Sequence, residues 1–424
     1  MLIWKQAPTV AEIGVRKVYL PGPVLSGPRD ARITVQGLPP VSPNVTGDLI
    51  AAVGSDAFDT IHTFAVVRQT LTMYQRALGS AAPWEWNSVT NTDPLNVFPH
   101  AGTAMNAFYM RSQKALKFFF FDKPGAPAGT KIFTCRSLDI VAHETGHAIL
   151  DGLQPGWLTA TNNPAQTGAL HESFGDLTAI FLALSQLDQV EAIIAQTKAN
   201  LHDKTFISDL AEEFGLALGR PNGLRNADND LKLSQVGNEV HDLSQVFTGG
   251  IYDVLADIFR FEQKPSKKDD AAVLYEAAQY VCSLVLRALI AAPANGATFA
   301  DVVNRMLTIA FTDGKPVQYR NFIRNRFTLR EVVVSATPLT LDLAEGVFLA
   351  PNPNIDTGAV QSRRACCGTM QLAEYNGGEE ALQAEIEELQ KAIAENGDRR
   401  AVGKSVGKEV EGHGAAKAAA KAKS

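Results

Sequence analysis

The segment that most constrains this chain lies at residues 143–147, which read His-Glu-Thr-Gly-His. In a helix, side chains four positions apart lie one turn apart on the same face, so the imidazoles of His143 and His147 can reach a single ion. The apolar residues within 140–149 predict that the other face of this helix is buried. The segment therefore predicts a metal-bearing helix inside the protein.

Zinc suits this arrangement, because it binds nitrogen and oxygen donors as a tetrahedron, and a catalytic site keeps one position open for water. Glu144 stands beside the first histidine, where its carboxylate can hold that water without binding the metal. We predict Glu172 as the third ligand; it follows His147 after 24 intervening residues. Asp176 lies one helical turn further and is predicted to accept the free N–H of His143, which fixes the orientation of that ring.

His171 competes with Glu172 for the role of third ligand. Adjacent residues on a helix point about 100° apart, so only one of the two faces the ion. Glu172 is preferred because one helix face can then present both Glu172 and Asp176. We interpret His171 as a surface histidine or as a residue that supports a ligand from behind.

Other segments of the chain accompany this helix in a fixed order. They are Asn106-Ala107-Phe108-Tyr109, then Asp139 to Ala148, then His171-Glu172 with Asp176, then Leu224-Arg225 with Asp228, and finally Val240-His241. The set and its order resemble the thermolysin family of gluzincin metallopeptidases, over about residues 58–262.

The resemblance implies a zinc-dependent endopeptidase, which hydrolyses internal peptide bonds through a zinc-bound water activated by Glu144. It implies that Asn106 and the backbone of Ala107 hold an extended peptide by strand addition. His241 would donate a hydrogen bond to the oxyanion, and Arg225 would hold the substrate carbonyl beyond the cleaved bond. The implied fold is α+β with two lobes, a strand-rich N-terminal lobe and a mainly helical C-terminal lobe, with the active site between them.

The sequence also departs from that family. No tyrosine lies between His147 and Glu172, where the family has one that helps to bind the oxyanion; Trp157 is nearest and offers only an indole N–H. Asp139 matches a calcium ligand of the family, but Ala183 stands where a partner glutamate is expected. Calcium binding stays possible, whereas the family's paired calcium site is not predicted.

Two other functions remain open. A zinc aminopeptidase of the gluzincin type needs a carboxylate beside the substrate strand, and here Asn106 is followed by Ala107 rather than by an acid. A catalytically inactive zinc-binding scaffold is favoured by the missing tyrosine and opposed by Glu144, because a structural zinc site has no use for that carboxylate.

Composition and periodicity divide the chain into segments of different character. They are a Pro/Gly-rich segment at 1–57, an α+β lobe at 58–152, a helical lobe at 153–328, an irregular segment with short strands at 329–375, a charged helix at 376–397, and a Lys/Ala-rich tail at 398–424 that we predict to be disordered. Long helices are predicted at 58–78, 168–199, 243–262, 270–292 and 298–312. The apolar stripe within 379–395 could mediate weak dimerisation or pack against the body.

Charge and hydropathy limit the partners and the location. The net charge is −6, and an acidic body argues against nucleic acid as a partner, so a peptide or protein substrate is expected. The longest apolar stretch, 271–292, is interrupted by charged residues, which favours a buried core helix over a membrane span. The N-terminus lacks the features of a signal peptide, so we predict a cytoplasmic protein and leave open export by a route without a cleaved signal.

Overall fold

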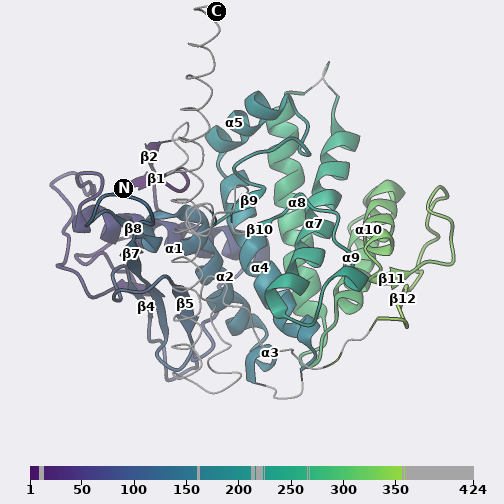
Figure 1. The fold of residues 1–424 in the computed structure, drawn as a ribbon, viewed down its shortest axis with the longest axis horizontal. Helices are drawn as coiled ribbons and strands as arrows, with labels where there is room; N and C mark the ends of the chain where they lie inside the picture. The colour runs from purple at the N-terminus through teal and green to yellow at the C-terminus, as the bar shows by residue number, and fades with distance from the viewer. Residues whose placement is uncertain are drawn as a thin grey trace, which may run out of the picture.

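The computed structural model describes residues 1–8, 14–159, 163–211, 225–264 and 268–355, together with residues 215, 223, 266 and 358. The charged helix predicted at 376–397 and the tail predicted at 398–424 lie outside the described residues. Within the described part, strands gather in the N-terminal third and helices make up most of the rest (Figure 1). The predicted α+β class is confirmed, while the predicted domain boundaries stay a prediction.

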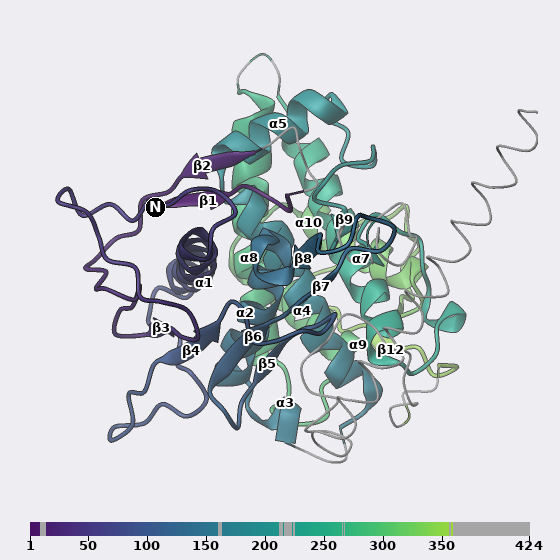
Figure 2. The same cartoon turned by 60° about the vertical axis from the view of Figure 1, so that its left-hand side comes forward.

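The main sheet has four strands in the order β3-β4-β6-β5. Their bounds are β3 Ile33–Val35, β4 Leu95–Phe98, β5 Ala107–Met110 and β6 Ala115–Phe118. Neighbours pair in parallel except β5, which is antiparallel to β6 and forms one edge of the sheet. Figure 2 shows the strands in this order beside α1 (Asp56–Leu78) and α2 (Leu138–Leu153). The edge strand β5 therefore runs next to the helix that carries the His-Glu-Thr-Gly-His segment, and it packs against that helix.

The remaining strands form two-stranded ribbons. They are β1 Leu2–Trp4 with β2 Val15–Lys17, β7 Phe120–Asp122 with β8 Lys131–Phe133, β9 Asp209–Leu210 with β10 Arg225–Asn226, and β11 Val333–Val334 with β12 Ala350–Pro351. Strands β1 and β2 lie in the segment predicted only as Pro/Gly-rich, because three-residue strands are too short to give a recognisable alternation of apolar and polar residues.

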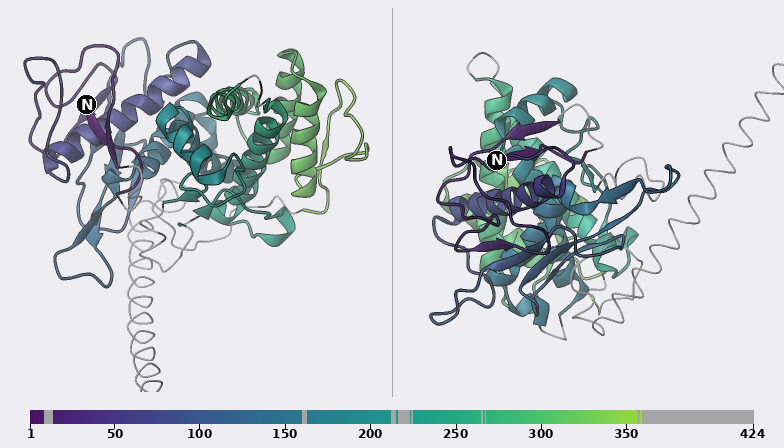
Figure 3. Two further views of the ribbon diagram at one scale, coloured as in Figure 1. Left: turned by 90° about the horizontal axis from the view of Figure 1, so that it is seen from above. Right: turned by 90° about the vertical axis from the view of Figure 1, so that its left-hand side faces the viewer.

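The helical part follows the sheet in the chain. Its helices are α2, α3 Gly156–Thr159, α4 Ala165–Leu184, α5 Leu187–Thr197, α7 Val240–Glu262, α8 Asp270–Ala291, α9 Phe299–Thr312 and α10 Val317–Leu329, with single 3-10 turns at Thr134–Arg136 and Leu233–Gln235. Seen from above in Figure 3, the N-terminal strands and α1 lie on one side and the C-terminal helices on the other. One continuous core of buried apolar side chains, extending from Ile3 to Leu349, joins the two sides.

Capping residues explain where several helices begin. The hydroxyl of Ser55 accepts a hydrogen bond from the N–H of Phe58, so α1 starts two residues earlier than the predicted 58. Thr298 and Asp301 form a capping box at the start of α9, as expected from the predicted start at 298.

The single helix predicted at 168–199 is wrong. The chain bends by 93° between α4 and α5. At the bend the backbone of Gln186 is extended. The guanidinium of Arg16 in β2 donates to the side chain of Gln186 and also, at 2.9 Å, to the carboxylate of Asp188. Contacts with a segment distant in the sequence therefore override a local helical pattern.

Helix α8 is the one helix in the described ranges that is long and apolar enough to cross a membrane, and the bent pair α4–α5 passes the same test if it is counted as one span. Helix α8 packs against α1, α5, α7 and α9, as expected for a core helix.

The last turn of α2 depends on Gly152, because a Cβ atom there would lie 2.1 Å from the carbonyl oxygen of Pro83. Alanine favours a helix over glycine by about 1 kcal/mol, whereas forcing the backbone of residue 83 aside costs about 1–3 kcal/mol. We predict that Gly152→Ala lowers the midpoint of thermal unfolding. An unchanged or raised midpoint would contradict this close approach of the loop to α2.

Candidate metal centre

The predicted ligands come together where α2 crosses α4. The Nε2 atoms of His143 and His147 lie 2.9 Å apart. Glu172 reaches them from α4, with 3.5 Å between its Oε2 and His143 Nε2 and 3.7 Å between its Oε1 and His147 Nε2. All three side chains are buried. The three donor atoms therefore converge on one point in the interior.

This donor set fits a zinc ion. Tetrahedral ligands about 2.0–2.2 Å from zinc are separated from one another by about 3.3–3.6 Å. The distance of 3.5 Å falls in this range, while 2.9 Å lies below it and 3.7 Å just above it. Within the described ranges, the Oε2 atom of Glu172 is buried without a hydrogen-bond partner. A buried carboxylate oxygen without a partner is costly unless a cation compensates it. The residues are thus suited to hold a cation, and their nitrogen and oxygen donors suit zinc.

Two glycines allow the helices to approach this closely. A Cβ atom on Gly175 would lie 2.6 Å from Cε1 of His143, and one on Gly146 would lie 2.6 Å from Oγ1 of Thr178. The imidazole of His143 therefore rests on the bare backbone of α4. These glycines were not predicted as part of the site, although each one interrupts the interior of a helix, which is an unfavourable place for glycine without a packing reason.

Asp176 contacts His143 at Nδ1, the ring nitrogen that does not face the other two residues of the cluster. Its Oδ1 is 3.0 Å from Nδ1 of His143, so the Nε2 atom of that ring is the one that faces His147 and Glu172. Arg225 donates to the same carboxylate through Nε at 2.9 Å and through a terminal nitrogen at 2.6 Å. Burial opposes the ionisation of Asp176, but Arg225 and His143 outweigh it and lower its pKa to about 2. Arg225, predicted to hold the substrate carbonyl, is thus already bound to the residue that orients a ligand.

His171 contacts His147 at Nδ1, the ring nitrogen that does not face His143 and Glu172. It is fully buried, so the interpretation as a surface histidine is wrong. Its Nδ1 atom lies 3.0 Å from Nδ1 of His147. Burial, reinforced by the positive charges of Arg111 and His143, lowers the pKa of His171 to about 3, so the ring stays neutral and can accept the N–H of His147. His143 is therefore supported by the carboxylate of Asp176, and His147 is supported by the imidazole of His171.

Glu144 points from α2 towards the edge of the sheet. Its Oε2 accepts a hydrogen bond of 3.0 Å from the backbone N–H of Tyr109 in β5. Burial raises the pKa of Glu144, with His143 opposing and Glu172 reinforcing the rise. A carboxyl with a raised pKa is better able to accept and return a proton at neutral pH.

The hollow beside the ligands joins α2, α4, β5 and the β9–β10 ribbon. It is lined by Ala107, Asp139, Ile140, His143, Glu144, Asp176, Ala179, Leu210, Ala211 and Arg225. Asn106 is buried at the start of β5, and its Oδ1 accepts the N–H of Ala107 at 2.8 Å. The structure thus brings Ala107 to the hollow itself, whereas the carbonyl oxygen of the Asn106 amide is used by its own backbone.

His241 reaches the ligands from the first turn of α7. Its Nε2 is 3.6 Å from Oε2 of Glu172, and its Nδ1 is 2.5 Å from Oε1 of Glu239. Glu239 also caps the helix, accepting the backbone N–H groups of His241 and Asp242. Burial opposes the ionisation of Glu239, but His241 and these N–H groups lower its pKa to about 2. Glu239 was not predicted from the sequence, although an acid directly before a helix and two residues from the histidine is a signal for it.

Trp157 and Asp139, which the sequence associated with the oxyanion and with calcium, have other partners here. The indole N–H of Trp157 donates to the carbonyl of Pro293 at 2.9 Å. Asp139 accepts the N–H of Ala211 at 2.7 Å through one oxygen and that of Ile140 at 2.9 Å through the other. Trp157 therefore serves the packing of α3 against the end of α8, and Asp139 ties the β9 segment to α2.

Comparisons with known proteins add little to this geometry. No protein-family model matches the chain, and no curated protein matches its sequence. A structure similar to it is that of the precursor of protealysin, a metalloproteinase from Serratia proteamaculans, at 15% identity and a TM-score of 0.47, over 74% of this chain and 89% of that chain. That likeness is too distant to decide a family, so the site itself has to indicate the function.

The contact between His171 and His147 predicts an effect on metal binding. Replacing a residue that supports a metal ligand typically weakens binding by about 10–100-fold. We therefore expect His171→Leu to release zinc to a competing chelator at least about tenfold more readily than the wild type. His62→Leu removes another fully buried histidine, outside the ligand cluster, and is expected to keep the wild-type affinity. Equal zinc affinity of wild type and His171→Leu would contradict the supporting role.

Proposed function

We propose that the protein is a zinc-dependent endopeptidase of the thermolysin-like gluzincin type. One observation carries this proposal: the carboxylate of Glu144 lines the same hollow as His143 and is bound by the backbone of the edge strand β5. A base, one residue of the metal-binding cluster and a strand edge that can receive a peptide thus meet in one hollow.

The peptide substrate would bind along β5. This strand pairs on one side with β6 and ends the sheet on the other, so its outer edge can receive an extended chain as a further strand. Binding through the backbone around Ala107 would place an internal peptide bond near Glu144. Asn106 holds the N–H of Ala107 and thereby orients the beginning of the strand.

The chemistry follows from the side chains around that bond. His143, His147 and Glu172 would hold the zinc ion, which when bound would supply a Lewis acid for the carbonyl and lower the pKa of water. Glu144 takes a proton from the attacking water as the carbon–oxygen bond forms. It then delivers that proton to the amide nitrogen as the carbon–nitrogen bond breaks.

His241 would stabilise the charge that develops on the carbonyl oxygen. The carboxylate of Glu239 holds Nδ1 and so orients the ring with Nε2 towards Glu172, where a donated hydrogen bond would reach the carbonyl oxygen. Asp176 stays ionised between His143 and Arg225 and holds both groups in place. Arg225 lines the hollow, where it can contact the part of the substrate beyond the cleaved bond.

Two rival functions are distinguished by experiment. An aminopeptidase needs a negative group that binds a free amino terminus, so it would hydrolyse peptides with a free terminus and fail on blocked ones. A catalytically inactive zinc-binding scaffold is favoured by the commitment of the Trp157 N–H to Pro293. Such a scaffold would bind zinc and hydrolyse neither kind of peptide.

The test uses the full zinc-loaded chain with Glu144→Gln. Loss of the general base is expected to lower kcat by about 10²–10⁴-fold, while the zinc content stays at that of the wild type because Glu144 is not a ligand. Glu276→Gln removes an exposed carboxylate on α8 and serves as the matched control. Casein and peptides blocked at the N-terminus are the substrates, and zinc is measured on the same samples.

Hydrolysis of blocked peptides by the wild type and the control, but not by Glu144→Gln, would support the proposal. Equal activity of Glu144→Gln and the wild type would contradict it. Hydrolysis restricted to free amino termini would favour the aminopeptidase, and zinc without any hydrolysis would favour the scaffold.

A further inference from the structure

One wall of the hollow is the segment that we call the cleft ribbon, residues 205–211 and 225–230, which contains β9 and β10. Its strands pair with Arg225 opposite Leu210 and Asn226 opposite Asp209. Leu210 and Arg225 line the hollow. The position of this ribbon therefore sets the width of the site on that side.

At its inner end the ribbon is tied to the helices that carry the ligands. The N–H of Ala211 donates to Asp139 of α2 at 2.7 Å, and Arg225 binds Asp176 of α4. These bonds fix one end only. A two-stranded ribbon is marginally stable by itself, so its other end also needs an attachment.

At its outer end the ribbon is attached in two places. Asn229 donates to the carbonyl of Gln245 on α7 at 3.1 Å and accepts from Arg330 at 3.1 Å, and Asp228 pairs with His202.

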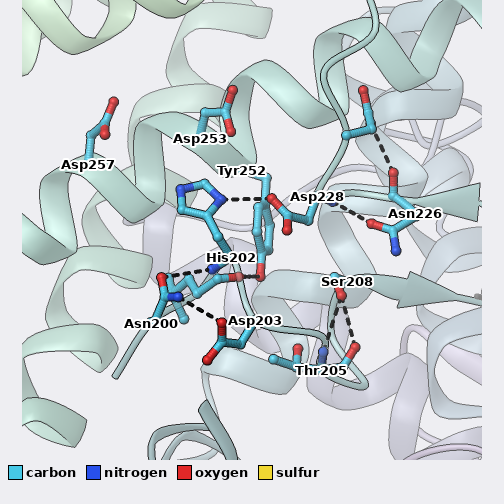
Figure 4. Close-up of polar contacts among 12 residues, drawn as sticks. Asn200, His202, Asp203, Thr205, Ser208, Asn226, Asp228, Tyr252, Asp253 and Asp257 are labelled. Carbon is cyan, nitrogen blue, oxygen red and sulfur yellow. Dashed lines mark hydrogen bonds and ion pairs between the residues drawn. The ribbon is translucent and has the colours of Figure 1, made fainter. Parts of the chain in front are cut away.

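Nδ1 of His202 lies 2.8 Å from Oδ1 of Asp228, three residues after Arg225 in the chain. The hydroxyl of Tyr252 on α7 donates to the carbonyl of Leu201 at 2.7 Å and so fixes the segment that carries His202 (Figure 4). Asp228 is held in turn by Asn226, whose Oδ1 accepts its backbone N–H at 2.7 Å.

The charges around His202 explain why Asp228 is its main partner. Asp253 and Asp257 face it from α7, but Arg330 binds Asp253 at 2.9 Å and Arg326 binds Asp257 at 2.6 Å. The other charged groups nearby are Arg260 of α7 and Asp203 and Lys204 of its own segment.

His202, Asp228 and Asp253 each offer a ligand atom, and these atoms lie within 4.8 Å of one another. Arg330 binds the buried carboxylate of Asp253 at 2.9 Å, so this carboxylate already has a cationic partner within the protein.

We propose that the ion pair between His202 and Asp228 positions the cleft ribbon, and that peptide affinity falls when His202 loses its proton. The part concerning affinity rests on the proposed peptidase function, whereas the anchoring of the ribbon does not. His202 and Asp228 act through Arg225 and Leu210 and are positioning residues.

The direction of the pH effect follows from the ionisation of His202. The hydrogen bond to Asp228 raises the pKa of His202, burial opposes the rise, and the charges of Asp228 and Asp253 add to it while Arg326 opposes it. A raised pKa in the folded state means that the stabilisation is complete at low pH and is lost as pH rises through that pKa. The His202 side chain is 43% exposed, so solvent screens the pair. We therefore expect effects of only about threefold.

Hydrogen exchange of the full zinc-loaded chain tests the anchor without reference to catalysis. At pH 6, where wild-type His202 is charged, His202→Gln should exchange the amides of 205–211 and 225–230 about threefold faster. His202→Lys keeps a permanent charge and should match the wild type at pH 6 but stay slower at pH 8, after correction for intrinsic rates. Arg287→Gln breaks a comparably exposed pair with Asp313 between α8 and the end of α9, and should leave the ribbon unchanged.

Kinetics with a blocked peptide then test the effect on the substrate. His202→Gln should raise KM about threefold at pH 6 with kcat unchanged, and His202→Lys should abolish the rise of KM with pH that the wild type shows. Unchanged ribbon exchange in His202→Gln would overturn the anchor, and faster exchange without a change in KM would overturn its link to affinity. Faster exchange in a chain that hydrolyses nothing would uphold the anchor and overturn the peptidase proposal.

Discussion

The close crossing of α2 and α4 is the constraint on which the site depends. Gly146 and Gly175 lack side chains where the helices meet, and the ring of His143 occupies the space above the backbone of Gly175. Larger residues would separate the helices and move Glu172 away from both imidazoles. The ligand geometry is thus a consequence of helix packing, and the buried apolar side chains around the crossing keep it rigid.

The charged groups around this crossing are buried in partnered sets. Asp176 lies between His143 and Arg225, and Glu239 lies against His241 and the start of α7. Each acid therefore keeps its charge in an interior that disfavours isolated ions. The same contacts leave one nitrogen of His143 and one of His241 facing the place where the ion and the substrate would meet. Stability and orientation thus come from the same hydrogen bonds.

Local sequence patterns were sufficient to predict part of this arrangement. The spacing of His143 and His147 and the i, i+4 relation of Glu172 and Asp176 depend only on helix geometry, so the sequence could indicate which side chains share a face. Contacts between segments that are distant in the sequence could not be predicted from such patterns. The burial of His171 against His147, and the bend that divides α4 from α5, both follow from tertiary packing that no local periodicity encodes.

The position of the metal ion is the property on which the proposed function depends most directly. The most direct measurement is anomalous X-ray diffraction at the zinc edge from crystals of the full chain grown with one equivalent of zinc. We predict one strong peak about 2.0–2.2 Å from Nε2 of His143, Nε2 of His147 and a carboxylate oxygen of Glu172. A peak at another cluster, or none at these three residues in a chain that retains zinc, would contradict the account.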